Sequence, residues 1–183
     1  MTPSEAAKFA SIYDTYYRHV YAYCRRRVDV DQIEDVVAEV FLTLWRKIGQ
    51  APSGEDALKW LYRTAHLVLS NHWRGSNRKK KLVQKLQSIG LESAPLVPDQ
   101  IVLRDEVREV LEAAERLRPR DIEILRLALW EELDLGAIAE VLQIKSNAAK
   151  QRLHRAKKNL IKEYERTHPL EAQSPAAQKG GEW

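Results

Sequence analysis

The chain has 183 residues, of which 44% are hydrophobic, and it contains seven glycines and seven prolines. This composition excludes a disordered or collagen-like chain and predicts one or two small folded domains. The single cysteine cannot form an internal disulfide, and no cysteine and histidine cluster has zinc spacing. No apolar run reaches the roughly 18 residues of a membrane span, and the N-terminal pattern is not that of a secretion signal. We therefore expect a cytoplasmic protein without a metal or another cofactor.

Charge is segregated along the chain, although the net charge is only +4. Residues 29–39 contain five acidic side chains and no basic one, whereas residues 57–91 contain eight basic side chains and no acidic one. A second basic block, residues 145–162, contains seven basic side chains and no acidic one. Two separate basic blocks indicate two contacts with one polyanion. Each block alone is also typical of a solvated helix face.

Amphipathic helices are predicted throughout the first half of the chain. Residues 2–5 have the pattern of a capping box with a first-turn proline, and apolar residues then recur every three or four positions up to Val28. A second helix is predicted from about residue 31 to residue 48, and a third over residues 55–73, followed by a shorter basic helix. Cys24 lies in the first apolar stripe, so we expect a small core residue.

The domain boundary is placed where helical periodicity is lost, at residues 88–99, which contain two prolines. A helix follows, and Pro119 then starts another helix with Ile122, Leu125 and Leu129 as its apolar stripe. We therefore predict an all-α fold of two small helical domains joined by a flexible linker.

A helix-turn-helix is predicted in the second domain. Asp134 is the expected N-cap of a short helix over residues 135–142, residues 143–145 form the turn, and a longer basic helix follows. From residue 169 onward, most side chains are small or polar, so we expect a disordered tail.

The predicted second helix carries Leu42 and Trp45 on the side opposite its apolar stripe. Apolar side chains at solvent-facing positions are typical of a protein-docking surface. The alternative is a helix buried on both sides by its own domain. The predicted docking face consists of Asp35, Glu39, Leu42, Trp45 and Arg46.

Two basic helices have faces that suit nucleic acid. On the third helix, Trp60 shares a side with cationic and amide groups, a combination that offers stacking and phosphate contact to single strands. A tryptophan packed against the neighbouring helix explains Trp60 equally well. On the last helix, amide and guanidinium groups lie opposite the apolar stripe, where they can pair with base edges in the major groove. A solvated helix is the alternative there.

The chain resembles the extracytoplasmic-function sigma factors of bacterial RNA polymerase, over about residues 9–165, in three stretches: DQIEDVVAEVFLTLWRKIG, ALKWLYRTAHLVLSNHWRGSNRKK and LRPRDIEILRLALWEELDLGAIAEVLQIKSNAAKQRLHRAKKNL. The resemblance implies a sigma region 2 domain over residues 1–87, a linker over 88–103, a region 4 helix-turn-helix domain over 104–168 and a tail over 169–183. It further implies an alternative sigma factor that directs promoter-specific transcription initiation and has no catalytic residue.

The resemblance also implies partners and site residues. The partners are core RNA polymerase, through its β′ clamp helices and β flap, promoter DNA, and an anti-sigma factor that could hold the protein at the inner membrane face; no small-molecule substrate and no membrane insertion are expected. The minus-ten DNA residues are Trp60, Arg63, Thr64, Leu67, Asn71, Arg74 and Arg78. The minus-thirty-five DNA residues are Lys145, Ser146, Asn147, Lys150, Gln151, Arg152, His154, Arg155 and Lys158.

Three positions depart from the family pattern. Leu67 stands where members often have an asparagine tied to a flipped base, Gln143 where the turn usually has glycine, and Gly136 where an acid is usual. The left-handed conformation that glycine favours must then be tolerated by Gln143, or the turn must change. The alternative function is a stand-alone, dimeric helix-turn-helix repressor or activator, for which no dimerisation surface or ligand pocket is evident in the sequence.

Overall fold

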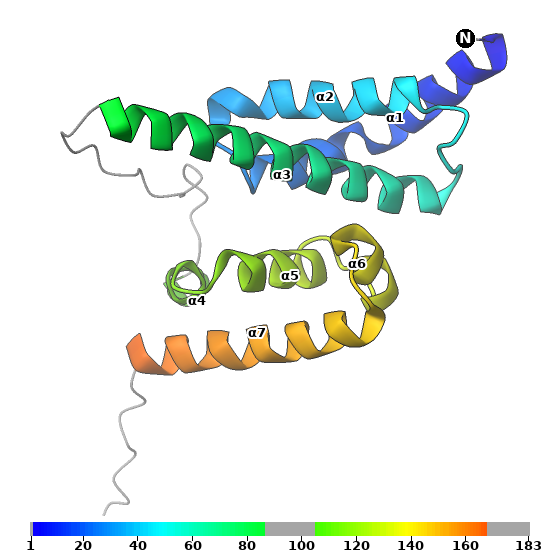
Figure 1. Ribbon diagram of the computed structural model, residues 1–183. Coiled ribbons are helices and arrows are strands. Elements are labelled where there is room, and N and C mark those ends of the chain that lie inside the picture. The colour runs from blue at the N-terminus through cyan, green and yellow to red at the C-terminus, as the bar shows by residue number, and fades with distance from the viewer. Residues whose placement is uncertain (1, 87–104, 168–183) are drawn as a thin grey trace, which may run out of the picture.

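The computed structural model describes residues 2–86 and 105–167, whose regular elements are all helical. The first group is α1 (Pro3–Arg25), the short 3-10 helix η1 (Val30–Gln32), α2 (Ile33–Arg46) and α3 (Glu55–Leu86). The second group is α4 (Asp105–Glu115), α5 (Pro119–Leu129), α6 (Leu135–Leu142) and α7 (Ser146–Thr167). The groups form two layers, one above the other in Figure 1. The predicted all-α class with two helical domains is confirmed, while the predicted linker, 88–103, and tail, 169–183, lie outside the described residues.

Helix α1 begins with the predicted capping box. The Thr2 hydroxyl accepts from the Glu5 amide at 3.2 Å, and the Glu5 carboxylate accepts from the Thr2 amide at 2.7 Å. This reciprocal pair satisfies two backbone donors that a helix start leaves without partners. Cys24 is fully buried on the same helix, as expected of a core residue, and burial raises the pKa of its thiol to about 12.

Helix α3 is longer than the sequence pattern predicts. We expected a helix to end near Trp73 and a separate basic helix to follow, but one helix runs from Glu55 to Leu86. The glycine at position 75 costs about 1 kcal/mol in a helix interior. That cost is too small to break a helix whose first half is fixed by the buried side chains Leu61 and Leu69.

The second layer contains the predicted helix-turn-helix. Asp134 caps α6, because its carboxylate accepts from the Ala137 amide at 2.8 Å. Gln143 ends α6 in the left-handed region, with φ 54° and ψ 45°. The turn therefore keeps its ordinary geometry, and the glutamine tolerates a conformation that glycine would adopt without strain. Helix α7 then packs through the fully buried Ala149 and Ala156.

Helix α5 differs from its predicted amphipathic pattern. The predicted stripe included Leu129, but that side chain is exposed, whereas Ile124 and Leu127 are fully buried. Two charged residues of α5, Asp121 and Glu123, are buried as well. The reason is that α5 packs on α7 on one side and faces the first layer on the other, so burial does not follow a single stripe.

Candidate polymerase-docking and nucleic-acid interfaces

The predicted docking face of α2 is exposed. Leu42 is 47% exposed and Trp45 44% exposed, which excludes the alternative of a helix buried on both sides by its own domain. The Trp45 ring meets the Phe9 ring of α1 edge-on, with centroids 5.0 Å apart. On the same face, the Arg46 guanidinium Nη1 lies 3.5 Å from the Glu39 carboxylate Oε1. An apolar patch with a charged rim is the usual composition of a protein-binding surface.

Aromatic side chains of α1 extend this surface, which the sequence did not reveal. Tyr13 is partly exposed, and its ring centroid lies 5.9 Å from that of Phe9 and 4.7 Å from that of Phe41 on α2. The α1 pattern places Tyr13 in the apolar stripe, as though it were a core residue. The three-to-four spacing identifies which side of α1 meets α2, but it cannot tell the centre of that contact from its exposed edge.

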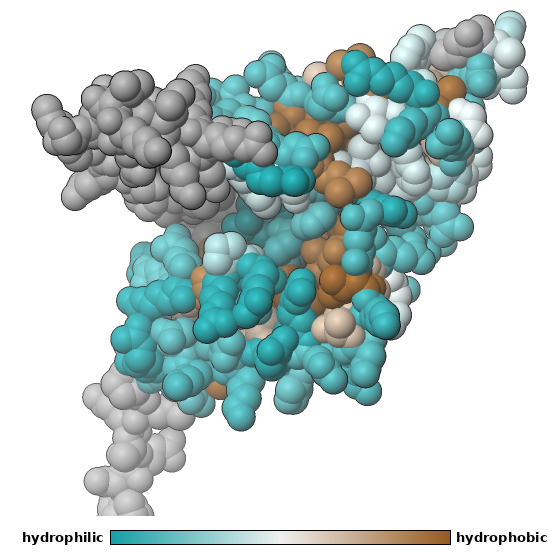
Figure 2. Space-filling view, in the orientation of Figure 1, coloured by the Kyte–Doolittle hydropathy of each residue, from teal (hydrophilic) through white to brown (hydrophobic). Residues whose placement is uncertain are grey.

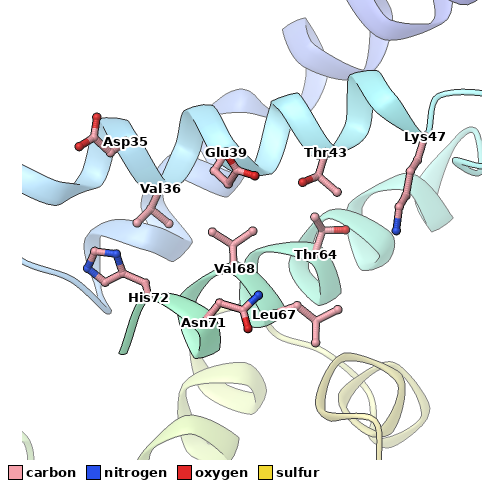
Figure 3. A pocket seen from close by; sticks show the side chains of 10 residues that line it. All are labelled: Asp35, Val36, Glu39, Thr43, Lys47, Thr64, Leu67, Val68, Asn71 and His72. Atoms are coloured by element: carbon pink, nitrogen blue, oxygen red, sulfur yellow. The ribbon is translucent and has the colours of Figure 1, made fainter. Parts of the chain in front are cut away.

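A groove of about 520 Å³ separates α2 from α3 (Figure 3). Val36 and Val68 face each other across it, while Asp35 and Glu39 belong to one wall and Asn71 to the other. The structure therefore brings two predicted docking residues and part of the predicted minus-ten set to one groove. Its lining residues are Asp35, Val36, Glu39, Thr43, Lys47, Thr64, Leu67, Val68, Asn71 and His72.

The predicted minus-ten residues differ in accessibility. Arg63, Asn71 and Arg74 are exposed, and the Arg74 guanidinium donates to the Asn71 side-chain oxygen at 2.7 Å. Thr64, by contrast, is only 7% exposed, and its hydroxyl donates to the Trp60 carbonyl of its own helix at 2.9 Å. Thr64 therefore contributes to the groove wall rather than to an exposed face.

Trp60 is half-buried and packs against the hydrophobic core. This packing fits the structural explanation that the sequence left open beside base stacking. Leu67 is partly exposed, and its side chain points toward α6 in Figure 3. The side chain of Arg78 lies outside the described residues.

The predicted minus-thirty-five residues form a continuous exposed face on α7 and the turn before it. Arg152 is half-buried, whereas the other eight are exposed. Within the described residues 2–86 and 105–167, no ion pair joins any of these cations to an acidic side chain. Figure 2 shows hydrophilic side chains over most of α7 in this view. The face is therefore available to a polyanion without breaking an existing contact.

An ion-pair network joins the two layers. The fully buried Arg27 side chain, just beyond α1, donates to Glu123 of α5 at 3.0 Å and to Glu131 at 2.9 Å. Its guanidinium carbon lies 3.5 Å from the centroid of the Tyr23 ring, and the Tyr23 hydroxyl donates to Glu123 at 3.1 Å. Arg26 donates to Glu131 at 2.8 Å. Cation–π contact and charge-assisted hydrogen bonds thus act together on one guanidinium.

The network changes the ionisation of its members. Burial alone would raise the pKa of the Glu123 carboxyl, but hydrogen bonding and positive charge from His66 and Arg27 outweigh it and lower that pKa to about 2. His66 Nδ1, on α3, lies 3.6 Å from the Glu123 carboxylate. Burial also lowers the pKa of the neighbouring Arg126, with repulsion from Arg27 as a further cause. Glu123 is therefore held as a carboxylate by its surroundings.

A second contact joins α3 to the helix-turn-helix. With the Gln143 amide oriented so that its oxygen faces α3, that oxygen accepts from Arg63 Nε at 3.2 Å and from Nη2 at 2.9 Å. Arg63 and the turn residues Lys145 and Ser146 line one hollow of about 390 Å³. Hydrophobic side chains gather beside it, where α3 and α6 approach each other (Figure 2).

Two family models match the chain: Sigma-70 region 2 over residues 12–79 and Sigma-70 region 4 over residues 107–160. Over 162 residues the chain is 28% identical to the ECF RNA polymerase sigma factor BldN of Streptomyces coelicolor. The chain belongs to the extracytoplasmic-function sigma factors. The BldN match covers 86% of this sigma factor but only 61% of BldN. The ECF sigma factor SigW of Bacillus subtilis is 27% identical, with 85% of this chain and 88% of SigW covered.

Solved structures share the fold of this sigma factor. The sigma factor RpoE in complex with the anti-sigma factor NepR from Bartonella quintana gives a TM-score of 0.64 at 20% identity, and covers 85% of this chain and 95% of RpoE. CnrH in complex with the cytosolic domain of CnrY gives a TM-score of 0.56 at 16% identity, with 84% of this chain and 85% of CnrH covered. At these identities the likeness concerns the fold alone.

Metal-binding clusters and membrane-spanning helices are both absent from the described residues of this sigma factor. There, no three histidine, cysteine, aspartate or glutamate side chains are grouped to hold a metal ion. In the same part of the chain, no helix has the length and apolar character that crossing a membrane requires.

Proposed function

We propose that this sigma factor binds core RNA polymerase through the α2 docking face and directs promoter-specific initiation in the cytoplasm. In this proposal α7 reads the minus-thirty-five element and α3 captures the minus-ten element. The observation that carries the proposal is that Leu42 and Trp45 are exposed on the same domain as the basic helix α3. A docking surface beside a nucleic-acid surface is what a polymerase subunit requires.

The chemistry of initiation belongs to the polymerase in this proposal, and this chain contributes binding alone. On α7, Gln151 and Arg155 pair with base edges in this proposal, while Lys158 meets a phosphate. On α3, Arg63 and Asn71 stabilise bases that have left the duplex stack, at the edge of the groove shared with α2. The predicted boundaries, 1–87, 88–103, 104–168 and 169–183, define the parts that carry these roles.

An anti-sigma protein is the proposed regulator. RpoE, which shares this fold, was solved bound to an anti-sigma factor. A partner of this kind would compete for surfaces that core polymerase and DNA also need. Its effect would be to keep the sigma factor from the polymerase until a signal releases it.

A double substitution tests the docking face directly. Leu42→Asp combined with Trp45→Ala should weaken binding to purified core polymerase at least about a hundredfold, because truncation of a buried interface anchor costs about 2 kcal/mol or more. Helical content and thermal stability should change little, since both side chains are nearly half exposed. Val30→Asp is the matched control, because it places the same charge at another exposed apolar position of the domain. A large loss of stability in the double variant would show that these groups belong to the core.

Run-off transcription tests the function itself. Purified core polymerase with this chain should produce promoter-specific transcripts from a library of genomic fragments, and core polymerase alone should not. If the chain binds duplex DNA tightly by itself as a dimer and yields no such transcripts, the repressor hypothesis replaces the sigma-factor proposal.

A further inference from the structure

The groove between α2 and α3 is tied at one end by a hydrogen bond between its two sides. His72, on α3, lines the groove, and its ring nitrogen Nε2 lies 2.9 Å from the side-chain oxygen Oε1 of Gln32, which directly precedes α2. With the Gln32 amide in this orientation, His72 is the donor. Both side chains are half-buried. The bond therefore joins the start of one wall to the other wall, across 40 positions of sequence.

The opposite end of the groove is fixed by side chains of α1. Lys47 lies at that end in Figure 3 and begins the connection from α2 to α3. The Lys8 ammonium donates to the Ala51 carbonyl of this connection, and the Tyr16 hydroxyl donates to the Gly54 carbonyl at 2.9 Å. Both donors belong to α1. The connection is therefore held from a third helix at two points.

The Tyr16 bond acts where the chain turns into α3. Gly54 has a positive φ of 66°, a conformation that other residues rarely adopt. Its carbonyl also accepts from the Ala57 amide at 3.0 Å, in the first turn of α3. A hydrogen bond to this carbonyl therefore holds the start of the helix that forms one wall of the groove.

Apolar packing alone defines the spacing of the two walls less sharply than these hydrogen bonds do. Val36 and Val68 face each other across the groove, but apolar contact is non-directional. A hydrogen bond, by contrast, weakens steeply when its geometry changes. Groups that bind a ligand must be held to within about 0.5 Å by their supporting side chains. Bonds at both ends of the groove provide such support for its edge, where Asn71 lies.

We propose that Gln32, His72 and Tyr16 are positioning residues of the minus-ten site, which hold the α2–α3 groove at the spacing that a displaced strand requires. The proposal rests on the proposed function, in which Asn71 at the edge of this groove stabilises unstacked bases. The three positioning side chains do not contact DNA themselves. They fix the groove before the strand arrives, so that binding does not have to order it.

Strand binding by the holoenzyme tests the proposal. The probe is the fluorescein-labelled, single non-template strand of a promoter recovered by run-off transcription. His72→Phe and Gln32→Leu should each weaken its binding about twofold to tenfold, the range expected for one net hydrogen bond. The double variant should bind no more weakly than either single variant, because both substitutions remove the same bond. Tyr16→Phe should have a similar effect from the other end of the groove.

Two conservative variants separate positioning from other roles. His72→Gln keeps a side-chain N–H donor and should bind the strand like the wild-type protein. Tyr21→Phe removes a hydroxyl from another position of α1 and should also bind like the wild-type protein. Affinity for core polymerase and for a minus-thirty-five duplex should stay unchanged in every variant, because neither predicted surface includes these residues. Thermal unfolding checks that each variant is folded.

Three results would overturn the proposal. Equal weakening by His72→Gln and His72→Phe would mean that His72 contacts the strand itself. Wild-type binding by His72→Phe, Gln32→Leu and Tyr16→Phe, together with weakened binding by Asn71→Ala, would remove the positioning role and leave the minus-ten site in place. Wild-type binding by Asn71→Ala, or failure to recover any promoter, would instead remove the proposed function on which the positioning role rests.

Discussion

Helices α3 and α7 are both long, basic and amphipathic, yet they present their charges differently. The outer face of α7 is exposed from Asn147 to Lys158, and most of it is directed to solvent. The corresponding side of α3 faces the second layer, where Arg63 bonds to Gln143 at the end of α6 and His66 lies beside Glu123 of α5. The difference teaches that basic composition identifies a surface for nucleic acid, whereas packing against the neighbouring domain determines how its side chains are engaged.

The largest expected effect comes from substitutions on α3. Arg63→Ala and Asn71→Ala should each reduce transcription from a duplex promoter about tenfold or more, because a captured base is stabilised by roughly 1 to 3 kcal/mol that must offset the cost of unstacking. Holoenzyme and closed complex should still form. A template mismatched across the minus-ten region removes the cost of opening, so transcription should recover on it.

Permanganate reactivity of unpaired thymines measures this opening directly. Arg18→Ala, at an exposed α1 position outside the predicted DNA set, is the control and should react like the wild-type protein. Asn71→Ala is the more informative variant, because Arg63→Ala also removes the bond to Gln143. Wild-type reactivity in both α3 variants would contradict their role in strand capture.

Acid should separate the layers while leaving the α7 face unchanged. Contact between the layers lowers the pKa of Glu123 from 4.5 to about 2, so this contact gains stability that is fully present above pH 4.5 and is lost as the pH falls toward 2. A difference of this size corresponds to on the order of 3 kcal/mol. The charged and titratable groups around Glu123 are Tyr23, Arg26 and Arg27 at the end of α1, His66 on α3, and Arg126 and Glu131 from α5 and the turn after it.

A pulsed spin-label distance between Ser11→Cys on α1 and Asn159→Cys on α7, two exposed positions, checks this prediction when it is followed from pH 6 to pH 3. The wild-type distance should lengthen across the lower part of that range, whereas Glu123→Gln, which has no carboxyl to protonate, should show a much weaker dependence. A wild-type distance that stays constant down to pH 3 would mean that the Glu123 carboxylate does not hold the two layers together.

The smallest expected effects come from substitutions on α7, the exposed helix of the two. Arg155→Ala or Gln151→Ala should weaken binding to a minus-thirty-five duplex by about 1 to 3 kcal/mol and relax the preference at particular bases. Lys158→Ala should weaken binding evenly across sequences. It should also lower the slope of log binding constant against log salt concentration by roughly one. Fluorescence titrations at several salt concentrations measure both quantities. Equal losses of affinity on every sequence for all three variants would show that α7 contacts phosphates and does not read bases.

The local elements could be predicted from the sequence because their signals are local. The capping box at Thr2, the N-cap at Asp134 and the turn at Gln143 each depend on residues within four positions of one another, and the structure has all three. The exposed Leu42 and Trp45 followed from helical periodicity in the same way. Continuity of α3 through the glycine at position 75 did not, because propensity alone overestimates a single glycine as a helix end.

Only the tertiary structure decided which neighbouring element covers each helix face. Glu123 and Leu129 show this on one helix: periodicity predicts Leu129 inside, but α5 is covered from two directions, so Glu123 is buried and Leu129 is exposed. Arg27 lies 96 positions before Glu123 in the chain, and no pattern within a helix relates two residues at that distance. Helical periodicity shows which side of a helix is apolar, whereas the partner on the other side is chosen by packing between domains. The sequence therefore determined the helices and their charged faces, and the packing of the two layers decided which of those faces is free.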